Sequence, residues 1–289
     1  MSMKLRTEIE PFRPSFSVSH DDRIVLLGSC FSDNIGSRLV RDGFEALHNP
    51  LGPLYNPLSL ARLIENLLDA RVYTEDDFVS DSEGGVHCLD FASRYQHPEA
   101  KQLVDSLNSE FSALKTAFDQ STVLIITFGS SVVYSLDGTL DGVVGNCHKF
   151  PADFFRRMTV SIDDIADRWQ PLVARLKQQG KHLLFTVSPI RHLADGLHGN
   201  QLSKARLLLA CEKLSEEADY FPAYEIMMDD LRDYRFYERD LKHPSELACD
   251  YIYDKFSECF FSQETASIAA KKRQEFLRSA HRPIINNIR

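Results

Sequence analysis

One cysteine stands at a position where a chain can activate a nucleophile. Residues 24–35 read IVLLGSCFSDNI, so an apolar run ends in Gly28-Ser29-Cys30 and a helical pattern follows. This pattern predicts a strand, a tight turn and a helix, with Cys30 at a corner where enzymes often place a nucleophile. The unpaired N–H groups and the dipole of the helix N-terminus are expected to bias the thiol toward thiolate. A buried structural cysteine is the alternative, because free cysteines are often buried.

A second pair of catalytic residue types lies near the C-terminus. The chain reads Asp240-Leu-Lys-His243-Pro just before a helical pattern at 246–261. An aspartate three residues before a histidine can accept the Nδ1–H of the ring, which leaves Nε2 free to take a proton from a nucleophile. The same spacing occurs at Asp195 and His198, so the spacing alone is weak evidence. Only the later histidine is followed by proline and the start of a helix.

Apolar runs of strand length alternate with helical patterns along the chain. The runs are 24–27, 123–128 and 183–187, and the helical patterns cover 33–41, 58–68, 100–118, 162–178, 202–218 and 246–261. Strands that alternate with helices require crossover connections. We therefore expect an α/β fold with a doubly wound, mostly parallel sheet and helices on both faces, in a flavodoxin-like three-layer arrangement. Ligands of such sheets bind beyond the carboxyl ends of the strands, which here carry 28–30, 129–131 and 188–192.

Composition narrows the class of protein and its partners. The 289 residues carry a net charge of −9, which argues against a nucleic-acid partner because phosphate binding requires a basic surface. Six cysteines without a C-x-x-C pair predict reduced thiols, and the chain has no apolar stretch of 18 residues. We expect a cytoplasmic protein without a metal, a cofactor or a membrane partner. The sequence does not indicate an oligomeric state.

The predicted elements suggest one main domain. We expect the α/β domain at 21–262, an N-terminal extension at 1–20, and a C-terminal helix and tail at 263–289. An acidic segment at 73–97 contains consecutive glycines at 84 and 85 and is predicted to be an insertion or lid-like loop.

The turn at Cys30, the polar turn after a middle strand and the Asp-x-x-His motif together resemble the SGNH, or GDSL-type, hydrolase superfamily. More closely, the chain resembles the GSCFA family within it, named for the turn that reads Gly-Ser-Cys-Phe-Ser at 28–32, with serine in place of the final alanine. Further blocks similar to that family lie at 49–57, 146–149, 188–192, 203–205 and 220–225.

This resemblance implies catalytic roles. It places Cys30 at the nucleophile position, with Ser29 where ordinary GDSL enzymes carry aspartate. It also places His243 at the general base and Asp240 at the carboxylate that orients the base.

The resemblance also implies an oxyanion hole. The N–H groups of Cys30 and Gly52 match two donors of the superfamily. Ser131 stands where the third donor, an asparagine, is expected. Asn146 is a candidate replacement, since an amide N–H can bind an oxyanion, and the alternative is that it caps its own turn.

Four residues are candidates for substrate binding: Ser29, His148, Arg191 and His192. Arg191 follows a predicted strand end, where its planar guanidinium could bind a carboxylate or phosphate. A structural ion pair with Asp195 is the alternative. A metal at His148 and its neighbouring cysteine is not expected, because adjacent residues chelate poorly and no further ligand spacing is present.

The resemblance implies hydrolysis of ester bonds in a small-molecule acyl substrate, through a Cys/His/Asp triad and an acyl-enzyme. A thioester keeps the acyl group activated, so acyl transfer to an amine or alcohol, or amide cleavage, are alternatives with the same intermediate. A small-molecule binding module without catalysis is an alternative of another class. The missing asparagine favours a binding module, whereas the retained Asp240 and His243 oppose it.

Overall fold

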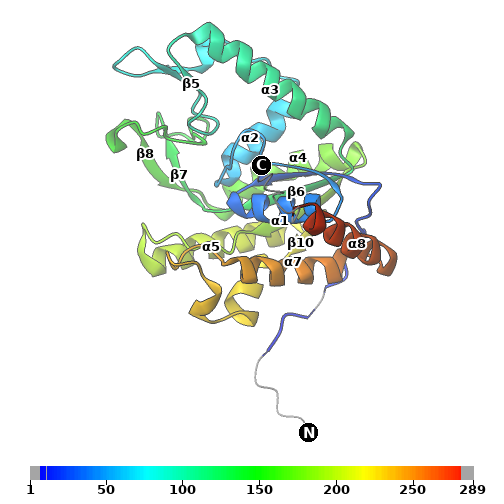
Figure 1. Ribbon diagram of the computed structural model, residues 1–289. Helices are drawn as coiled ribbons and strands as arrows, with labels where there is room; N and C mark the ends of the chain where they lie inside the picture. Colours follow the sequence, from blue (N-terminus) through cyan, green and yellow to red (C-terminus); the bar gives the residue numbers. More distant parts are fainter. Residues whose placement is uncertain (1–6, 11, 281–289) are drawn as a thin grey trace, which may run out of the picture.

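A five-stranded parallel sheet forms the centre of the computed structural model, which describes residues 7–10 and 12–280 (Figure 1). The strands are β1 (Arg23–Gly28), β2 (Glu45–His48), β6 (Val123–Phe128), β9 (His182–Val187) and β10 (Asp219–Phe221). Their order across the sheet is β10-β9-β6-β1-β2. Counted along the chain within this sheet alone, the order is 2-1-3-4-5, which is that of flavodoxin-like folds. The predicted doubly wound α/β fold is confirmed.

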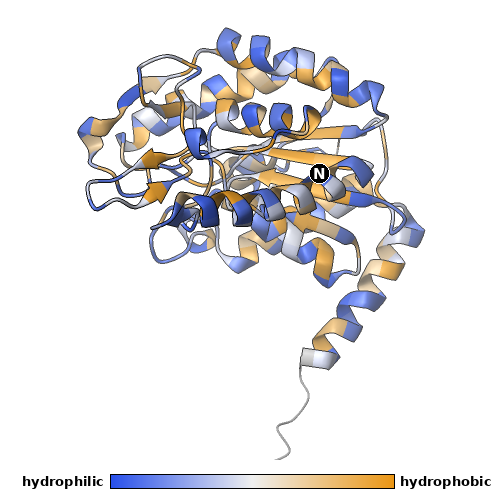
Figure 2. Ribbon diagram, turned by 90° about the horizontal axis from the view of Figure 1, so that it is seen from above, coloured by the Kyte–Doolittle hydropathy of each residue, from blue (hydrophilic) through white to orange (hydrophobic). Residues whose placement is uncertain are grey.

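Helices cover both faces of this sheet. They are α1 (Cys30–Arg41), α2 (Pro57–Leu68), α3 (Ala100–Gln120), α4 (Ile162–Gln178), α5 (Gly196–Leu214), α6 (Ala223–Glu225), α7 (Glu246–Phe260) and α8 (Gln263–Ala280). Successive strand residues point to opposite faces, so Val25 and Leu27 pack with α2 to α5 while Ile24 and Leu26 pack with α1 and α7. Figure 2 shows the apolar strands enclosed by helices with hydrophilic outer faces.

Several element boundaries differ from those predicted. The helix predicted at 202–218 begins earlier, at Gly196, and ends at Leu214. Strands β2 and β10 were not predicted, because each is short, lies at an edge of the sheet and is only partly buried. Such strands have no continuous apolar run to reveal them.

Two small antiparallel sheets lie outside the main sheet, next to each other in Figure 1. One contains β3 (Val79–Ser80), β4 (Val86–His87) and β5 (Gln96–His97), within the segment predicted as an insertion. The other contains β7 (Val132–Ser135) and β8 (Arg156–Thr159). Leu89, Val144 and Phe155 form a separate hydrophobic cluster between their connecting loops. Short helical turns lie at Glu75–Asp77, Ala152–Phe154, Ile226–Asp230 and Tyr234–Phe236.

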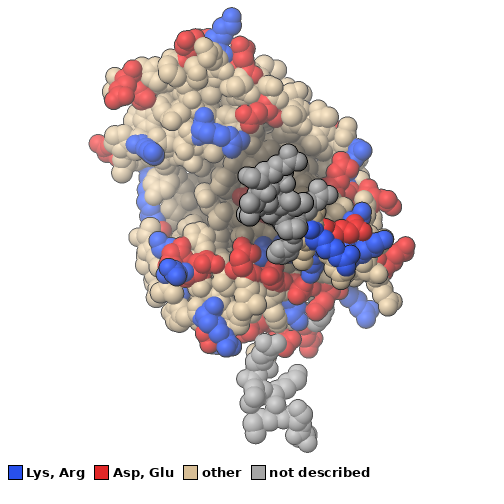
Figure 3. Space-filling view, viewed as in Figure 1, with Lys and Arg blue, Asp and Glu red and all other residues tan. Residues whose placement is uncertain are grey.

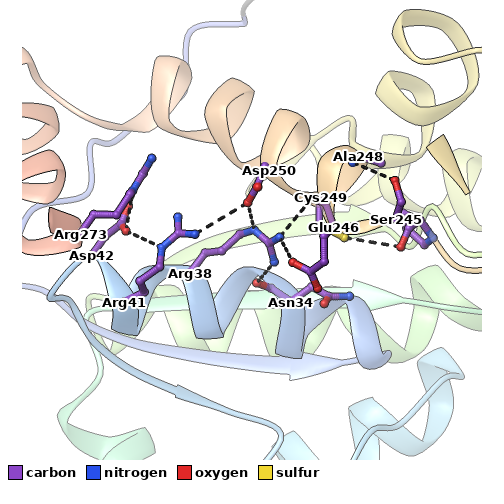
Figure 4. Close-up of polar contacts among 11 residues, drawn as sticks. Asn34, Arg38, Arg41, Asp42, Ser245, Glu246, Ala248, Cys249, Asp250 and Arg273 are labelled. Atoms are coloured by element: carbon purple, nitrogen blue, oxygen red, sulfur yellow. Dashed lines mark hydrogen bonds and ion pairs between the residues drawn. The ribbon is translucent and has the colours of Figure 1, made fainter. Parts of the chain in front are cut away.

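Arg38 joins α1 to α7 (Figure 4). Its side chain is buried, with Nε donating to Asp250 Oδ1 at 2.8 Å and Nη2 donating to Glu246 Oε2 at 2.7 Å. Nη1 donates to the Asn34 carbonyl at 3.1 Å. Because the guanidinium has acceptors on both helices, it fixes their relative position.

Asp42 joins the end of α1 to α8 (Figure 4). Its carboxylate is fully buried and accepts from Arg41 Nε at 3.0 Å and from Arg273 Nε at 2.9 Å. A buried carboxylate stays ionised only where such partners replace water. The C-terminal helix therefore stabilises the far end of the helix that begins at Cys30.

The N-terminal segment and the first half of α8 pack against the main domain. Phe16 and Val18, in the segment predicted as an extension, are buried, and the Val18 N–H donates to the Phe260 carbonyl at 2.8 Å. Residues 281–289 of the predicted tail lie outside the described residues. Acidic and basic side chains intermingle on the face shown in Figure 3. In the described part of the chain, no helix combines the length and the apolar character needed to cross a membrane.

Candidate active site

The turn after β1 has the geometry of a strand-to-helix corner. Gly28 has a φ of +145°, and a Cβ there would collide with the Thr127 carbonyl, so only glycine fits this position. Ser29 is the N-cap of α1, with Oγ accepting the Phe31 N–H at 3.2 Å, and it is 1% exposed. Cys30 is the first helical residue and is partly exposed. The side chain of Ser29 is therefore used in the cap, whereas that of Cys30 is accessible.

This corner lies at the topological switch point of the sheet. β1 and β6 are neighbours, with Gly28 opposite Thr127, and the helices that follow them along the chain, α1 and α4, cover opposite faces. Ligands of doubly wound folds bind at such a crevice. Asn49 fixes the corner, because Oδ1 accepts the Gly28 N–H at 2.9 Å and Nδ2 donates to the Ser29 carbonyl at 3.1 Å.

The surroundings of Cys30 shift the pKa of its thiol in opposite directions. Burial raises the pKa of the Cys30 thiol above its ordinary value, and the nearby Asp33 carboxylate raises it further. The backbone N–H of Cys30 and the amine of Lys204 lower it. The expected bias toward thiolate is therefore wrong for the structure as it stands, because burial and Asp33 outweigh the start of the helix.

Asp240 and His243 form a hydrogen-bonded pair. His243 Nδ1 lies 2.5 Å from Asp240 Oδ2, and the N–H groups of Lys242 and His243 donate to Asp240 Oδ1 at 2.9 and 3.0 Å. The His243 N–H and ring, followed by the Lys242 N–H, hold the pKa of Asp240 well below its usual range. Both side chains are more than two-fifths exposed. With Nδ1–H bound to the carboxylate, Nε2 is left to exchange protons.

The Asp240–His243 loop packs against the segment that follows β9. The Lys242 carbonyl accepts the Arg191 N–H at 3.1 Å, and His243 contributes to the low pKa of His192. Among the hydrogen bonds of the described residues, none joins Cys30 to the His243 ring. The structure thus brings these residues to one edge of the sheet without a hydrogen bond between Cys30 and His243 among the described residues.

A cavity of about 290 Å³ opens at this edge, with Tyr55, Ser130, Asn146 and His192 in its walls. Burial is the main cause that raises the pKa of Tyr55, and Cys30 raises it further. This wall residue therefore lies close to the cysteine. The His192 ring lies edge-on to Tyr55, with 6.3 Å between ring centroids. Burial, reinforced by Lys204, lowers the pKa of His192 to about 4, so the ring is neutral at pH 7.

Two residues implied as oxyanion donors have other partners. The N–H of Ser131 donates to Ser203 Oγ at 2.8 Å, and Ser131 Oγ donates to the same oxygen at 3.2 Å. The Gly52 N–H donates to the Asn49 carbonyl at 2.8 Å. Neither group is free to bind an oxyanion in this arrangement.

The other two candidate donors are available. The Cys30 N–H, at the first position of α1, is one of the donors that a helix start leaves unpaired. Asn146 Oδ1 accepts the His148 N–H at 2.9 Å, which is the capping contact of the alternative interpretation. Its amide N–H groups have no partner among the described residues, and the residue lines the cavity.

His148 contributes to the support of this wall. Its ring is buried, with Nε2 2.9 Å from the Phe91 carbonyl and Nδ1 3.3 Å from His87 Nδ1. His87 Nε2 lies 2.8 Å from Asp81 Oδ2. The His148 ring therefore connects the loop at 146–149 to the small β3–β5 sheet. Contact between His148 and a substrate stays a prediction. No group of three or more metal-ligating side chains occurs in the described part of the chain.

Arg191 borders a second cavity, of about 190 Å³, rather than the one beside His192. Its guanidinium lies 5.7 Å from the ring centroid of Tyr234 and 5.3 Å from that of Tyr237. The alternative ion pair with Asp195 is wrong, because Asp195 pairs with Arg157 of β8. Among the described residues no carboxylate neutralises Arg191, so its charge is available to an anion.

Lys204 lies in the block at 203–205 that resembles the family, but the sequence patterns did not predict a role for it at the site. It is 1% exposed, and Nζ donates to the carbonyls of Gly129 at 2.8 Å and Ser188 at 2.7 Å. Lys204, Leu207 and Leu214 all belong to the buried face of α5. A lysine at helical spacing with buried apolar residues is the signal that could have identified it.

The fold and the site define a class: a doubly wound α/β protein with a cysteine-bearing turn after its first strand and an Asp-x-x-His pair at the same sheet edge. The chain belongs to the GSCFA family, whose family model matches residues 23–256. No curated protein matches it significantly.

Solved structures with a similar arrangement include two esterases. The psychrotrophic esterase EstA from Pseudoalteromonas sp., inhibited by monoethylphosphonate, is 11% identical, with a TM-score of 0.38 over 82% of this chain and 94% of that chain. A catalytic mutant of Axe2, an acetylxylan esterase from Geobacillus stearothermophilus, is 12% identical, with a TM-score of 0.40 over 86% of this chain and 98% of that chain.

Proposed function

We propose that this protein hydrolyses ester bonds of small acyl substrates, with Cys30 as nucleophile, His243 as general base and Asp240 as the carboxylate that orients it. The observation that best supports this proposal is the 2.5 Å hydrogen bond between His243 Nδ1 and Asp240, at the sheet edge where Cys30 begins α1. The pair holds the ring in the tautomer that leaves Nε2 available. The adjacent cavity of about 290 Å³ has room for a small acyl ester.

The proposed reaction has two halves. Cys30 Sγ attacks the carbonyl carbon, the ester C–O bond breaks, and His243 transfers the thiol proton to the departing oxygen. Water then adds to the thioester while His243 takes its proton, and the C–S bond breaks to release the acid and restore the thiol. In each half the oxyanion would accept from the Cys30 N–H and the Asn146 amide.

A binding module without turnover is the second candidate. The observation that favours it is the combination of a raised Cys30 pKa and the lack of a hydrogen bond from Cys30 to His243. In this alternative the cavity binds a small molecule and Cys30 has no chemical role.

Hydrolysis of p-nitrophenyl acetate tests the proposal. We expect Cys30→Ala to abolish turnover and His243→Ala to lower it about a hundredfold or more, because general acid-base catalysis contributes factors of that order. A matched control is Cys259→Ala, which changes a partly exposed cysteine on α7 and should leave turnover intact. Acid quenching and peptide mass spectrometry should find the acetyl group on Cys30.

Two outcomes would reject the proposed triad. Full turnover in Cys30→Ala would remove Cys30 from the mechanism. No turnover by the wild type with p-nitrophenyl acetate or longer esters, together with no acylation of Cys30, would favour the binding module.

A further inference from the structure

A buried amine lies beneath the edge of the sheet where the proposed reaction takes place. Lys204 is 1% exposed, and no carboxylate forms an ion pair with it among the described residues. Its two hydrogen bonds go to backbone carbonyls, which do not neutralise a charge. Burying an ammonium in this way costs free energy, and such groups are typical of functional sites.

The two carbonyls belong to the turns that form the site. Gly129 directly follows β6 and Ser188 directly follows β9. Ser203, beside Lys204 on α5, binds the N–H and the hydroxyl of Ser131. Consecutive residues of one helix therefore hold both turns at the carboxyl edge.

The register of the sheet places this amine near Cys30. Gly28 of β1 lies opposite Thr127 of β6. Cys30 and Gly129 each lie two residues beyond this matched pair, in the segments that follow these neighbouring strands. Because the Gly129 carbonyl accepts from Lys204 Nζ at 2.8 Å, the amine lies under the turn next to the cysteine.

We propose that Lys204 is a positioning residue of this site: its amine fixes the turns after β6 and β9, and its protonated form supplies the positive charge that stabilises a thiolate at Cys30. This inference rests on the proposed function only in taking Cys30 as the reacting group.

The surrounding charges agree with this role. Lys204 lowers the pKa of Cys30, and Cys30 in turn raises that of Lys204. On α1, Asp33 acts against the thiolate, and Tyr55 faces the cysteine from the segment before α2. His192, from the segment after β9, is neutral at pH 7. Among these neighbours, Lys204 is the buried group whose positive charge favours a thiolate at Cys30.

Another neighbour of Lys204 is the ring of Tyr224, with Nζ 5.7 Å from its centroid. Burial lowers the pKa of Lys204 to about 7. The ammonium is therefore abundant below pH 7 and scarce at pH 9. A charge effect on Cys30 should follow this titration, whereas a purely structural effect should not.

The test is the rate at which iodoacetamide alkylates Cys30 in the full chain between pH 6 and 9, measured by peptide mass spectrometry. We expect Lys204→Met and Lys204→Gln to label Cys30 about tenfold more slowly than the wild type at pH 6, because one opposite charge shifts a thiol pKa by about one unit. The difference should shrink toward pH 9. Labelling of Cys259 in the same samples is the internal control.

Two of the variants separate the effect of charge from an effect on folding. Lys204→Gln retains two N–H donors for the carbonyls, so it tests the charge even where Lys204→Met does not fold. Lys204→Arg keeps its charge at every pH and should label at least as fast as the wild type at pH 9.

Unchanged labelling of Cys30 at pH 6 in both neutral variants would overturn the proposal, and so would an equal slowing at every pH. The assay measures thiol ionisation without a substrate. A wild type that hydrolyses no ester but shows this pH-dependent difference would therefore reject the proposed function and leave the role of Lys204 intact.

Discussion

The titration of Lys204 should be visible in the stability of the whole fold. Its pKa falls from an ordinary value of 10.5 to about 7 in the native protein, because the ammonium is buried. Between these two values the unfolded chain binds more protons at this residue than the native chain does. The free energy of unfolding therefore rises with pH across this window. Burial of Lys204 destabilises the native state by a constant amount below pH 7, and this destabilisation vanishes above pH 10.5.

The size of this effect follows from the two pKa values. Where the unfolded chain binds one proton more than the native chain, each pH unit changes the free energy of unfolding by about 1.4 kcal/mol. At pH 7 the native amine is half protonated, and at pH 9 it is neutral while the unfolded one is still mostly charged. Raising the pH from 7 to 9 should therefore stabilise the wild type by about 2 kcal/mol relative to Lys204→Met.

Urea unfolding followed by circular dichroism at both pH values measures this difference. The other titrating groups are common to the two proteins and largely cancel. Lys101→Met is the matched control, because Lys101 is exposed on α3 and its removal should leave the pH dependence unchanged. Parallel pH profiles for the wild type and Lys204→Met would refute the reasoning, because they would show that the carbonyls of Gly129 and Ser188 hold Lys204 fully charged to pH 9.

Three further substitutions have definite expected outcomes. Ser29→Ala removes the cap of α1 and should cost about 1 kcal/mol in urea unfolding while ester hydrolysis persists; loss of hydrolysis would instead assign the nucleophile to Ser29. Asp240→Asn should lower hydrolysis about a hundredfold or more, because the ring of His243 loses its orienting charge, and should also reduce stability at pH 7, because the folded state favours the ionised carboxylate; turnover within twofold of wild type would contradict the triad. Arg38→Met should lower the free energy of unfolding by about 2 kcal/mol, since it loses charge-assisted bonds to partly exposed carboxylates; an unchanged urea midpoint would show that α1 and α7 pack independently of it.

The sequence was informative where chemistry depends on local spacing. The corner at Cys30 depends on a strand, a glycine and a helix start that all lie within 24–35, and the strand-turn-helix order was predicted correctly, although α1 begins at Cys30 and not at the predicted residue 33. The contact between Asp240 and His243 is equally local. The parallel sheet was predicted, because crossovers and buried runs imply one, whereas the edge strands β2 and β10 carry too little apolar character to be recognised.

The rest of the site depends on contacts between distant segments. That Ser131 is bound by Ser203, and Asp195 by Arg157, could not be inferred from spacing, because these partners lie on different elements. The raised pKa of Cys30 has the same origin, since burial is a property of the assembled fold. Lys204 was hidden for a further reason, because a lysine in a helical pattern is ordinarily taken as exposed.

The ion pairs that stabilise α1 also determine when the site can form during synthesis. The cysteine corner leaves the ribosome before the other segments of the site. Asp42, at the other end of the same helix, has no partner from the C-terminal helix until Arg273 has been made, 231 residues later. Domains generally acquire their structure as synthesis proceeds from the N-terminus. This helix is therefore translated well before its contacts are complete, so Cys30 is held in its final setting only after α8 has been made.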